Sequence, residues 1–260
     1  MIIYEVQHIT NNPLNPEKMN NQETINQLEN LKLHGMANAF KAVVQMGVQN
    51  KPTLEQFMAQ AVESEQNSRN QRRTELYLRT SKLRFDVALE DVSCSLERNF
   101  TKEMLLSLGD CGFAQRAENL LITGKTGVGK SWLACAIGKH ACTMGYRAEY
   151  FAMNKFIERI GLAKLDGTLL KVINHICKRD VIIFDDFGLK PLDENSRLAL
   201  LQILEDCYEK RSVIITSQLP VGKWFDFIDE PTLADAIMDR VVSRSQRIEL
   251  KGESLRGKLK

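Results

Sequence analysis

The chain has 260 residues, a formal net charge of +2 and 43% hydrophobic residues. That length supports one sizeable core, or one core with a small accessory domain. The near-neutral charge leaves any affinity for nucleic acid to local basic patches, and the six cysteines contain no C-x-x-C pair with zinc-ligand spacing. We find no secretory segment at the start and no apolar stretch long enough to span a bilayer, so we expect a cytoplasmic protein without membrane contact.

The first third of the sequence predicts helices. Residues 1–20 carry Asn-Pro breakers and are expected to form a tail. From 21 to 85, apolar residues recur every three or four positions, which predicts a small all-helical domain. A second helix of this domain should begin near Thr53, because Gln56 follows three residues later as in a capping box. The rest of the chain, 86–260, is expected to form one α/β domain.

A basic stretch closes the helical region, between positions 69 and 84. At about 100° per residue, five of its six cations fall within an arc of roughly 140° if the helix is continuous. Such a face suits a phosphate backbone, although a solvated helix face explains it as well, because nothing in the stretch reads bases. The candidate DNA-binding residues are Arg69, Arg72, Arg73, Arg79, Lys82 and Arg84.

The stretch 124–131 has the spacing G-x-x-x-x-G-K-[ST], between an apolar run and an apolar helix. A strand that feeds a glycine loop opening a helix aims backbone N–H groups and the positive end of the helix dipole at one point, so an anionic pyrophosphate binds there. Lys130 is expected to reach the β- and γ-phosphates of ATP, and the Ser131 hydroxyl to bind Mg²⁺. The predicted nucleotide-binding residues are Gly124, Lys125, Thr126, Gly127, Val128, Gly129, Lys130 and Ser131.

From residue 120 onward, short apolar runs alternate with helical segments. Because runs of this kind are buried on both faces, they predict a parallel sheet flanked by helices. The expected strands lie at 120–123, 147–152, 181–184, 212–216 and 247–250.

Polar residues at the ends of two of these strands are candidates for hydrolysis chemistry. Asp185 follows a buried strand and is expected to hold Mg²⁺ through water, while Asp186 is expected to polarise the attacking water. Gln218 ends the next strand, where a sensor of the γ-phosphate or of water would lie. The stretch 216–218 also fits a simple polar turn before a proline.

Arg240 lies on a helix far downstream. An arginine fixed there fits an arginine finger that reaches across an interface to a neighbour's γ-phosphate. It fits equally a surface ion pair with Asp239 or Asp235, which would contribute little. The residue pattern alone does not choose between the two.

Several of these stretches together resemble the IstB-like transposition helper ATPases, a branch of the AAA+ proteins close to the DnaC-type helicase loaders. The phosphate loop is generic, whereas the T-S-Q-L-P-V and D-A-I-M-D-R stretches are far more specific, and the resemblance covers about residues 22 to 257. Trp132 departs from the histidine common at that position. The matching stretches are 31–36, 119–131, 183–188, 214–221, 235–240 and 252–256.

The resemblance implies an AAA+ P-loop domain behind a small helical N-terminal domain, with Arg240 as the arginine finger. It implies an ATP-dependent homo-oligomer whose sites are shared between subunits, and which binds duplex DNA and recruits or activates a partner transposase. Whether Arg256 acts as a second sensor stays open. The alternative is a DnaC-like helicase loader, which shares the ATPase core. A small-molecule kinase and a nucleotide-gated binding module also remain open.

Overall fold

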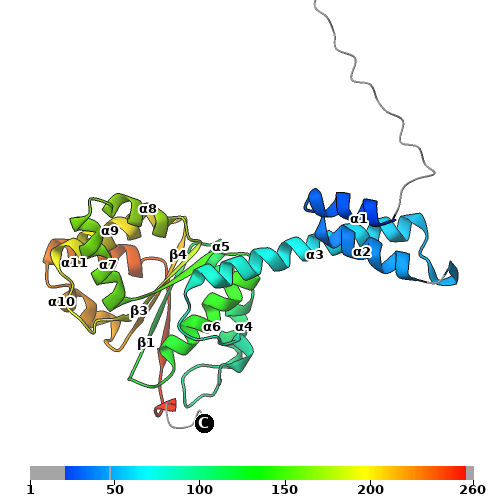
Figure 1. Cartoon of the computed structure of the whole chain (residues 1–260). Helices are drawn as coiled ribbons and strands as arrows, with labels where there is room; N and C mark the ends of the chain where they lie inside the picture. Colours follow the sequence, from blue (N-terminus) through cyan, green and yellow to red (C-terminus); the bar gives the residue numbers. More distant parts are fainter. Residues whose placement is uncertain (1–20, 47, 256–260) are drawn as a thin grey trace, which may run out of the picture. The chain divides into compact units, whose positions relative to one another are not determined.

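The computed structural model describes residues 21–46 and 48–255 (Figure 1). The chain divides into two compact units between Arg72 and Arg73, and each unit is described by itself. The expected tail at 1–20 and Arg256 lie outside the described residues.

The first unit is helical, as the apolar spacing predicted. Its second helical region begins with the expected capping box: Gln56 N–H donates to Thr53 Oγ1 at 3.3 Å, and Thr53 N–H donates to Gln56 Oε1 at 3.0 Å. Phe40 and Phe57 meet edge to face with ring centroids 6.1 Å apart. The elements are α1 (Asn21–Asn30), α2 (His34–Gln45), a 3₁₀ turn (Val48–Asn50) and the first part of α3 (Leu54–Ser81).

The second unit is built on a parallel five-stranded sheet in the order β2-β3-β4-β1-β5. This confirms the predicted parallel sheet flanked by helices. Because β1, β3 and β4 are adjacent and parallel, the loops that follow them meet at one edge of the sheet. The strands are β1 (Asn119–Gly124), β2 (Ala148–Ala152), β3 (Val181–Phe187), β4 (Ser212–Ser217) and β5 (Ser245–Leu250).

Two hydrophobic cores fill the two faces of this sheet. Successive residues of β3 alternate between them, so Ile183 packs in one core and Ile182 in the other. One face carries α4 (Lys102–Gly109), α5 (Gly112–Gln115) and α6 (Lys130–Thr143) (Figure 1). The other carries α7 (Met153–Leu165), α8 (Leu169–Cys177), α9 (Glu194–Cys207), α10 (Trp224–Ile228) and α11 (Pro231–Val242). Within the described residues, no helix is both long and apolar enough to cross a membrane.

Candidate nucleotide-binding site

The phosphate loop joins the end of β1 to the start of α6, as its motif predicted. Lys130, the first residue of α6, is only 5% exposed. Its Nζ donates to the Lys125 carbonyl at 2.9 Å, so the ammonium lies over the loop's own backbone. Gly127 has a φ of +85°, in the left-handed region that favours glycine. The loop therefore has the strand, turn and helix start that an anion site needs.

Two segments outside the motif brace this loop. Leu255 N–H donates to the Gly127 carbonyl at 2.9 Å, and Arg98 Nη2 donates to the Val128 carbonyl at 2.9 Å. A Cβ at Gly127 would lie 2.2 Å from Ser254 Oγ, which shows how closely residues 254 and 255 cover the turn. Neither contact was predicted from the sequence. The stretch 252–256 matched the family, but the match did not say where the stretch lies relative to the loop. Nothing in the sequence pattern marked Arg98.

The paired carboxylates lie at the end of β3, where the pairing with β4 is irregular. Between Phe184 and Phe187 the register shifts, and Asp186 has a φ of +62°. The Asp186 N–H donates to Thr216 Oγ1 at 3.0 Å. A left-handed non-glycine residue is strained, and such strain is common where a side chain must be aimed at a functional site.

Asp185 is fully buried and held by two hydroxyl groups. One oxygen accepts a hydrogen bond from Thr216 Oγ1, and the other accepts one from the Tyr150 hydroxyl at 2.5 Å. Burial and the neighbouring Asp185 carboxylate raise the pKa of Tyr150 well above its usual value, so its hydroxyl stays a donor. Tyr150 lies on β2, and nothing in the sequence pattern marked it as part of the site.

Thr216 and Ser217, the last two residues of β4, and Gln218, which follows them, have different partners. The Thr126 hydroxyl of the phosphate loop donates to Gln218 Oε1 at 2.6 Å, which places Gln218 against the loop. Thr216 binds Asp185, and the Ser217 hydroxyl donates to the Phe187 carbonyl at 2.6 Å. Of the three, Gln218 is the residue beside the phosphate loop.

The phosphate loop, Asp186 and Gln218 line a pocket of about 640 Å³, within the range of small-ligand sites. One of its lining side chains, Arg98, holds a buried Nε without a hydrogen-bond partner in the described structure. Such an orphaned donor favours a polar ligand. The lining residues used below are Arg84, Phe85, Thr126, Lys130, Ser131, Trp132, Asp186 and Gln218.

The donor set of this pocket suits Mg²⁺ held jointly with a nucleotide. The described residues include no cluster of three or more His, Cys, Asp or Glu side chains that would hold a metal by themselves. A Mg²⁺ ion bridged to phosphates needs fewer protein ligands, and a hydroxyl with a carboxylate is the usual pair. Ser131, which lines the pocket, and Asp185, which is buried next to it, would supply that pair, and Asp185 keeps lone pairs for a water-mediated contact beyond its two hydrogen bonds.

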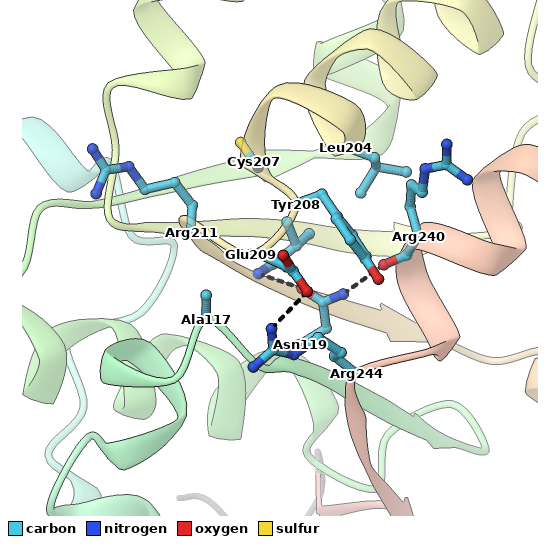
Figure 2. A pocket seen from close by; sticks show the side chains of 10 residues that line it. Ala117, Asn119, Leu204, Cys207, Tyr208, Glu209, Arg211, Arg240 and Arg244 are labelled. Carbon is cyan, nitrogen blue, oxygen red and sulfur yellow. Dashed lines mark hydrogen bonds and ion pairs between the residues drawn. The ribbon is translucent and has the colours of Figure 1, made fainter.

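Arg240 lies at the opposite end of β1 from the phosphate loop. Its carbonyl accepts a hydrogen bond at 3.0 Å from Asn119, the first residue of β1, whereas Gly124 is the last. Five residue steps of a strand separate these ends by roughly 16 Å. The Arg240 Cζ lies 5.9 Å from the centroid of the Tyr208 ring, and both side chains line the pocket drawn in Figure 2. The Arg240 guanidinium also pairs with Asp239 at 2.7 Å and Glu205 at 3.6 Å.

The structure separates the six candidate DNA-binding cations into two groups. Arg69, Arg72, Arg73 and Arg79 are exposed on α3. The helix ends at Ser81, however, and Lys82 has a φ of +54°, so the continuous helix expected through position 84 is wrong.

Lys82 and Arg84, the last two cations of that set, form ion pairs with acidic residues. Lys82 pairs with the buried Glu149 at 3.3 Å. Arg84 pairs with Asp185 at 3.9 Å and with Asp186 at 3.8 Å, inside the nucleotide pocket. Both side chains thus form their ion pairs within the second unit, to which they belong.

The geometry agrees with comparisons to known proteins. The description "IstB-like ATP binding protein" belongs to the family profile that matches residues 26–260. A relative from Sinorhizobium fredii (strain NBRC 101917 / NGR234), y4pL, bears a name describing it as an insertion sequence ATP-binding protein. It is 39% identical over 233 residues, which cover 90% of this chain and 95% of the relative.

Solved structures share the fold at low sequence identity. The DnaC helicase loader superposes with a TM-score of 0.52 at 19% identity, covering 67% of this chain and 98% of that one. AMPPCP-bound DnaA from Aquifex aeolicus gives a TM-score of 0.56 at 19% identity, covering 66% and 52%. These likenesses establish the AAA+ P-loop fold. Together with the family match over nearly the whole chain, they show that this protein belongs to the IstB-like ATP-binding family.

Proposed function

We propose that this chain is an ATP-hydrolysing, DNA-binding protein of an insertion sequence, which assembles on duplex target DNA and recruits or activates a partner transposase. The observation that carries the proposal is the division of the hydrolysis machinery. The phosphate loop, Asp186 and Gln218 share one pocket, with the buried Asp185 next to it, whereas Arg240 lies at the other end of the sheet. A protein arranged in this way completes its site only by assembly.

Within one subunit, each group has a defined task. Lys130 and the loop N–H groups bind the phosphates, and Ser131 and Asp185 would hold Mg²⁺, which neutralises the charge that develops on the phosphates. Asp186 orients and polarises the attacking water. Gln218, fixed to Thr126 at 2.6 Å, senses the terminal phosphate or the water next to it.

Between subunits, Arg240 supplies the missing positive charge. It lies too far from its own pocket, and its present partners Glu205 and Asp239 are exposed carboxylates that a neighbour's phosphate can replace. An arginine given in trans stabilises the transition state of phosphoryl transfer. The assembly is therefore a homo-oligomer whose formation depends on ATP.

We infer the DNA and transposase partners from the exposed positive charge of α3 and from the family to which the chain belongs. Exposed arginines of α3, at positions 69 and 72 in the first unit and at 73 and 79 in the second, are suited to contacts with phosphate backbones. The relative from Sinorhizobium fredii bears the name of an insertion sequence protein, and such an element moves by means of a transposase. We infer that this chain selects or prepares target DNA in the cytoplasm for that enzyme.

The proposal is tested by replacing the water-orienting carboxylate. Asp186→Asn should bind ATP within about twofold of the wild type but hydrolyse it at least 100-fold more slowly, because a positioned general base contributes about 10²- to 10⁴-fold. The trapped ATP state should form a persistent oligomer on duplex DNA, measured by sedimentation and by filter binding.

Lys130→Ala is the matched control, since it should lose nucleotide binding and assembly together. Wild-type hydrolysis by Asp186→Asn would refute the role of Asp186. Assembly that is equal with and without ATP, or that prefers single-stranded over duplex DNA, would refute the proposed function.

A further inference from the structure

Arg84 is a cation of the nucleotide pocket that the proposed hydrolysis scheme does not use. It lies on the loop after α3, three residues beyond Ser81, and its side chain is 49% exposed. Its Nη1 is 3.9 Å from Asp185 Oδ2 and 3.8 Å from Asp186 Oδ2. Both distances exceed the 2.7–3.2 Å range of an N–H···O hydrogen bond, so the guanidinium is paired only loosely with the carboxylates.

The backbone on both sides of Arg84 is anchored, which fixes where its side chain can reach. Lys82 is tied to the buried Glu149 at 3.3 Å, and Leu83 packs against the core beneath α6. On the other side, the Phe85 ring contacts Trp132 with centroids 5.4 Å apart. Arg84 therefore lies on a rigid support at the rim of the pocket.

The surroundings keep Arg84 charged and oriented. A hydrogen bond with Tyr150 is the largest influence that raises its pKa, while burial acts in the opposite direction. Its Cζ also lies 5.2 Å from the centroid of the Phe85 ring, a cation–π contact. Tyr150 in turn donates to Asp185, so one hydroxyl connects the guanidinium to the Mg²⁺-binding carboxylate.

Arg84 and Lys130 line the same pocket together with Thr126 and Gln218. A triphosphate on the loop would carry its terminal group toward Gln218 and Asp186, which is where Arg84 lies. A guanidinium binds phosphate oxygens in a bidentate fork, whereas an ammonium acts as a point charge. The terminal phosphate is thus a better partner for Arg84 than the two loosely paired carboxylates.

We propose that Arg84 is a contact for the terminal phosphate of ATP within the same subunit, and that it distinguishes ATP from ADP. Bound phosphate draws the guanidinium from Asp185 and Asp186, and Asp186 then orients water. ADP lacks the group and leaves Arg84 on the carboxylates. This inference rests on the proposed function, since it requires a nucleotide on the phosphate loop.

The test is equilibrium binding of a non-hydrolysable ATP analogue and of ADP to the full chain with Mg²⁺. In Arg84→Gln, affinity for the ATP analogue should fall about tenfold while affinity for ADP changes less than twofold, because one charge-assisted contact is lost. Arg84→Lys keeps the charge but not the bidentate fork, so its affinity for the ATP analogue should lie between that of the wild type and that of Arg84→Gln. Retained ADP binding shows that the variant pocket is folded.

Arg116→Gln is the matched control, because Arg116 is an exposed arginine paired with Glu118 at 2.8 Å, away from the pocket. It should bind both nucleotides as the wild type does. The inference would be overturned if Arg84→Gln left the ratio of the two affinities, for the ATP analogue and for ADP, unchanged. Failure of the wild type to bind either nucleotide would instead overturn the proposed function.

Discussion

At the scale of single residues, the start of the phosphate loop is set by how closely two backbones approach. A Cβ on Gly124 would lie 2.3 Å from the Leu250 carbonyl oxygen, which belongs to the neighbouring strand β5. Because that oxygen is part of the backbone, it cannot move aside as a flexible side chain would. Gly124 also has a φ of +145°, which side-chain-bearing residues rarely adopt.

Gly124→Ala should therefore lower the free energy of unfolding by about 1–3 kcal/mol, through strain and overpacking at β5. The control is Gly161→Ala on α7, where a Cβ meets nothing within 4 Å. That change should raise stability by about 0.5–1 kcal/mol, because alanine favours a helix over glycine. Urea unfolding of both variants measures the difference, and equal stabilities would contradict the steric account.

The motifs predicted which residues gather at the site better than they predicted what holds them. Strand-end carboxylates and a G-K-S loop must meet at one sheet edge, so Asp185 and Lys130 were found from spacing. Tyr150 was missed because a tyrosine inside a buried strand looks like core. Arg84 was placed on a helix face because the sequence contains no signal for the left-handed residue that ends α3 two positions earlier.

At the scale of elements, the N-terminus of α2 is capped by a side chain from α3. Glu65 accepts hydrogen bonds from the N–H groups of Gly35 at 2.8 Å and Met36 at 3.3 Å. Its other oxygen accepts from Arg69 Nε at 2.7 Å. Arg69 is the main cause that lowers the pKa of Glu65, with burial opposing and the two backbone donors assisting. This carboxylate satisfies orphan donors at a helix start and complements its dipole.

Glu65→Gln should weaken the α2–α3 contact by about 1–3 kcal/mol, because charged hydrogen bonds to three donors are replaced. Hydrogen exchange of the amides at the start of α2 measures the loss, and the exposed neighbour Glu63→Gln should change it by less than about 0.5 kcal/mol. Since the folded pKa of Glu65 is lowered, its contribution is present at neutral pH and is lost as pH falls through that lowered value. Unchanged exchange in Glu65→Gln would contradict the capping role.

The hydrophobic pattern of the sequence predicted the strands accurately where both faces of the strand are buried. The central strands were placed within a few residues, because runs such as 181–184 are apolar throughout. Strand β5 begins at Ser245, two residues before the apolar signal, because it lies at the sheet edge and its first residues are polar and partly exposed. Edge strands lack the continuous apolar pattern that reveals inner ones.

At the scale of the whole molecule, the proposed function divides the hydrolysis site into two halves, which lie at different ends of one subunit. The pocket carries the phosphate loop and Asp186, and the far end of the sheet carries Arg240, which lies near Tyr208 (Figure 2) and pairs with Glu205. Two defective subunits can then complement one another if their defects lie in different halves.

Mixing Lys130→Ala with Arg240→Ala should restore part of the ATP hydrolysis that each lacks alone. The Arg240→Ala subunit offers an intact pocket and its Lys130→Ala neighbour an intact arginine, which contributes about 10³-fold or more. Mixing Lys130→Ala with Asp186→Asn should restore nothing, since both defects lie in the pocket half. Steady-state phosphate release measures both mixtures, and full activity of Arg240→Ala alone would show that the arginine is dispensable.

In the proposed assembly, the separation of Arg240 from the pocket by the length of β1 gives each subunit a donor face and an acceptor face. Contacts of this head-to-tail kind either close into a ring or extend as a helix, and never pair two identical faces. An open helix along DNA would be polar: one end exposes an unused arginine, and the other an unfinished pocket. Such an assembly has a direction, so a second protein would meet two chemically different ends and dock at only one of them.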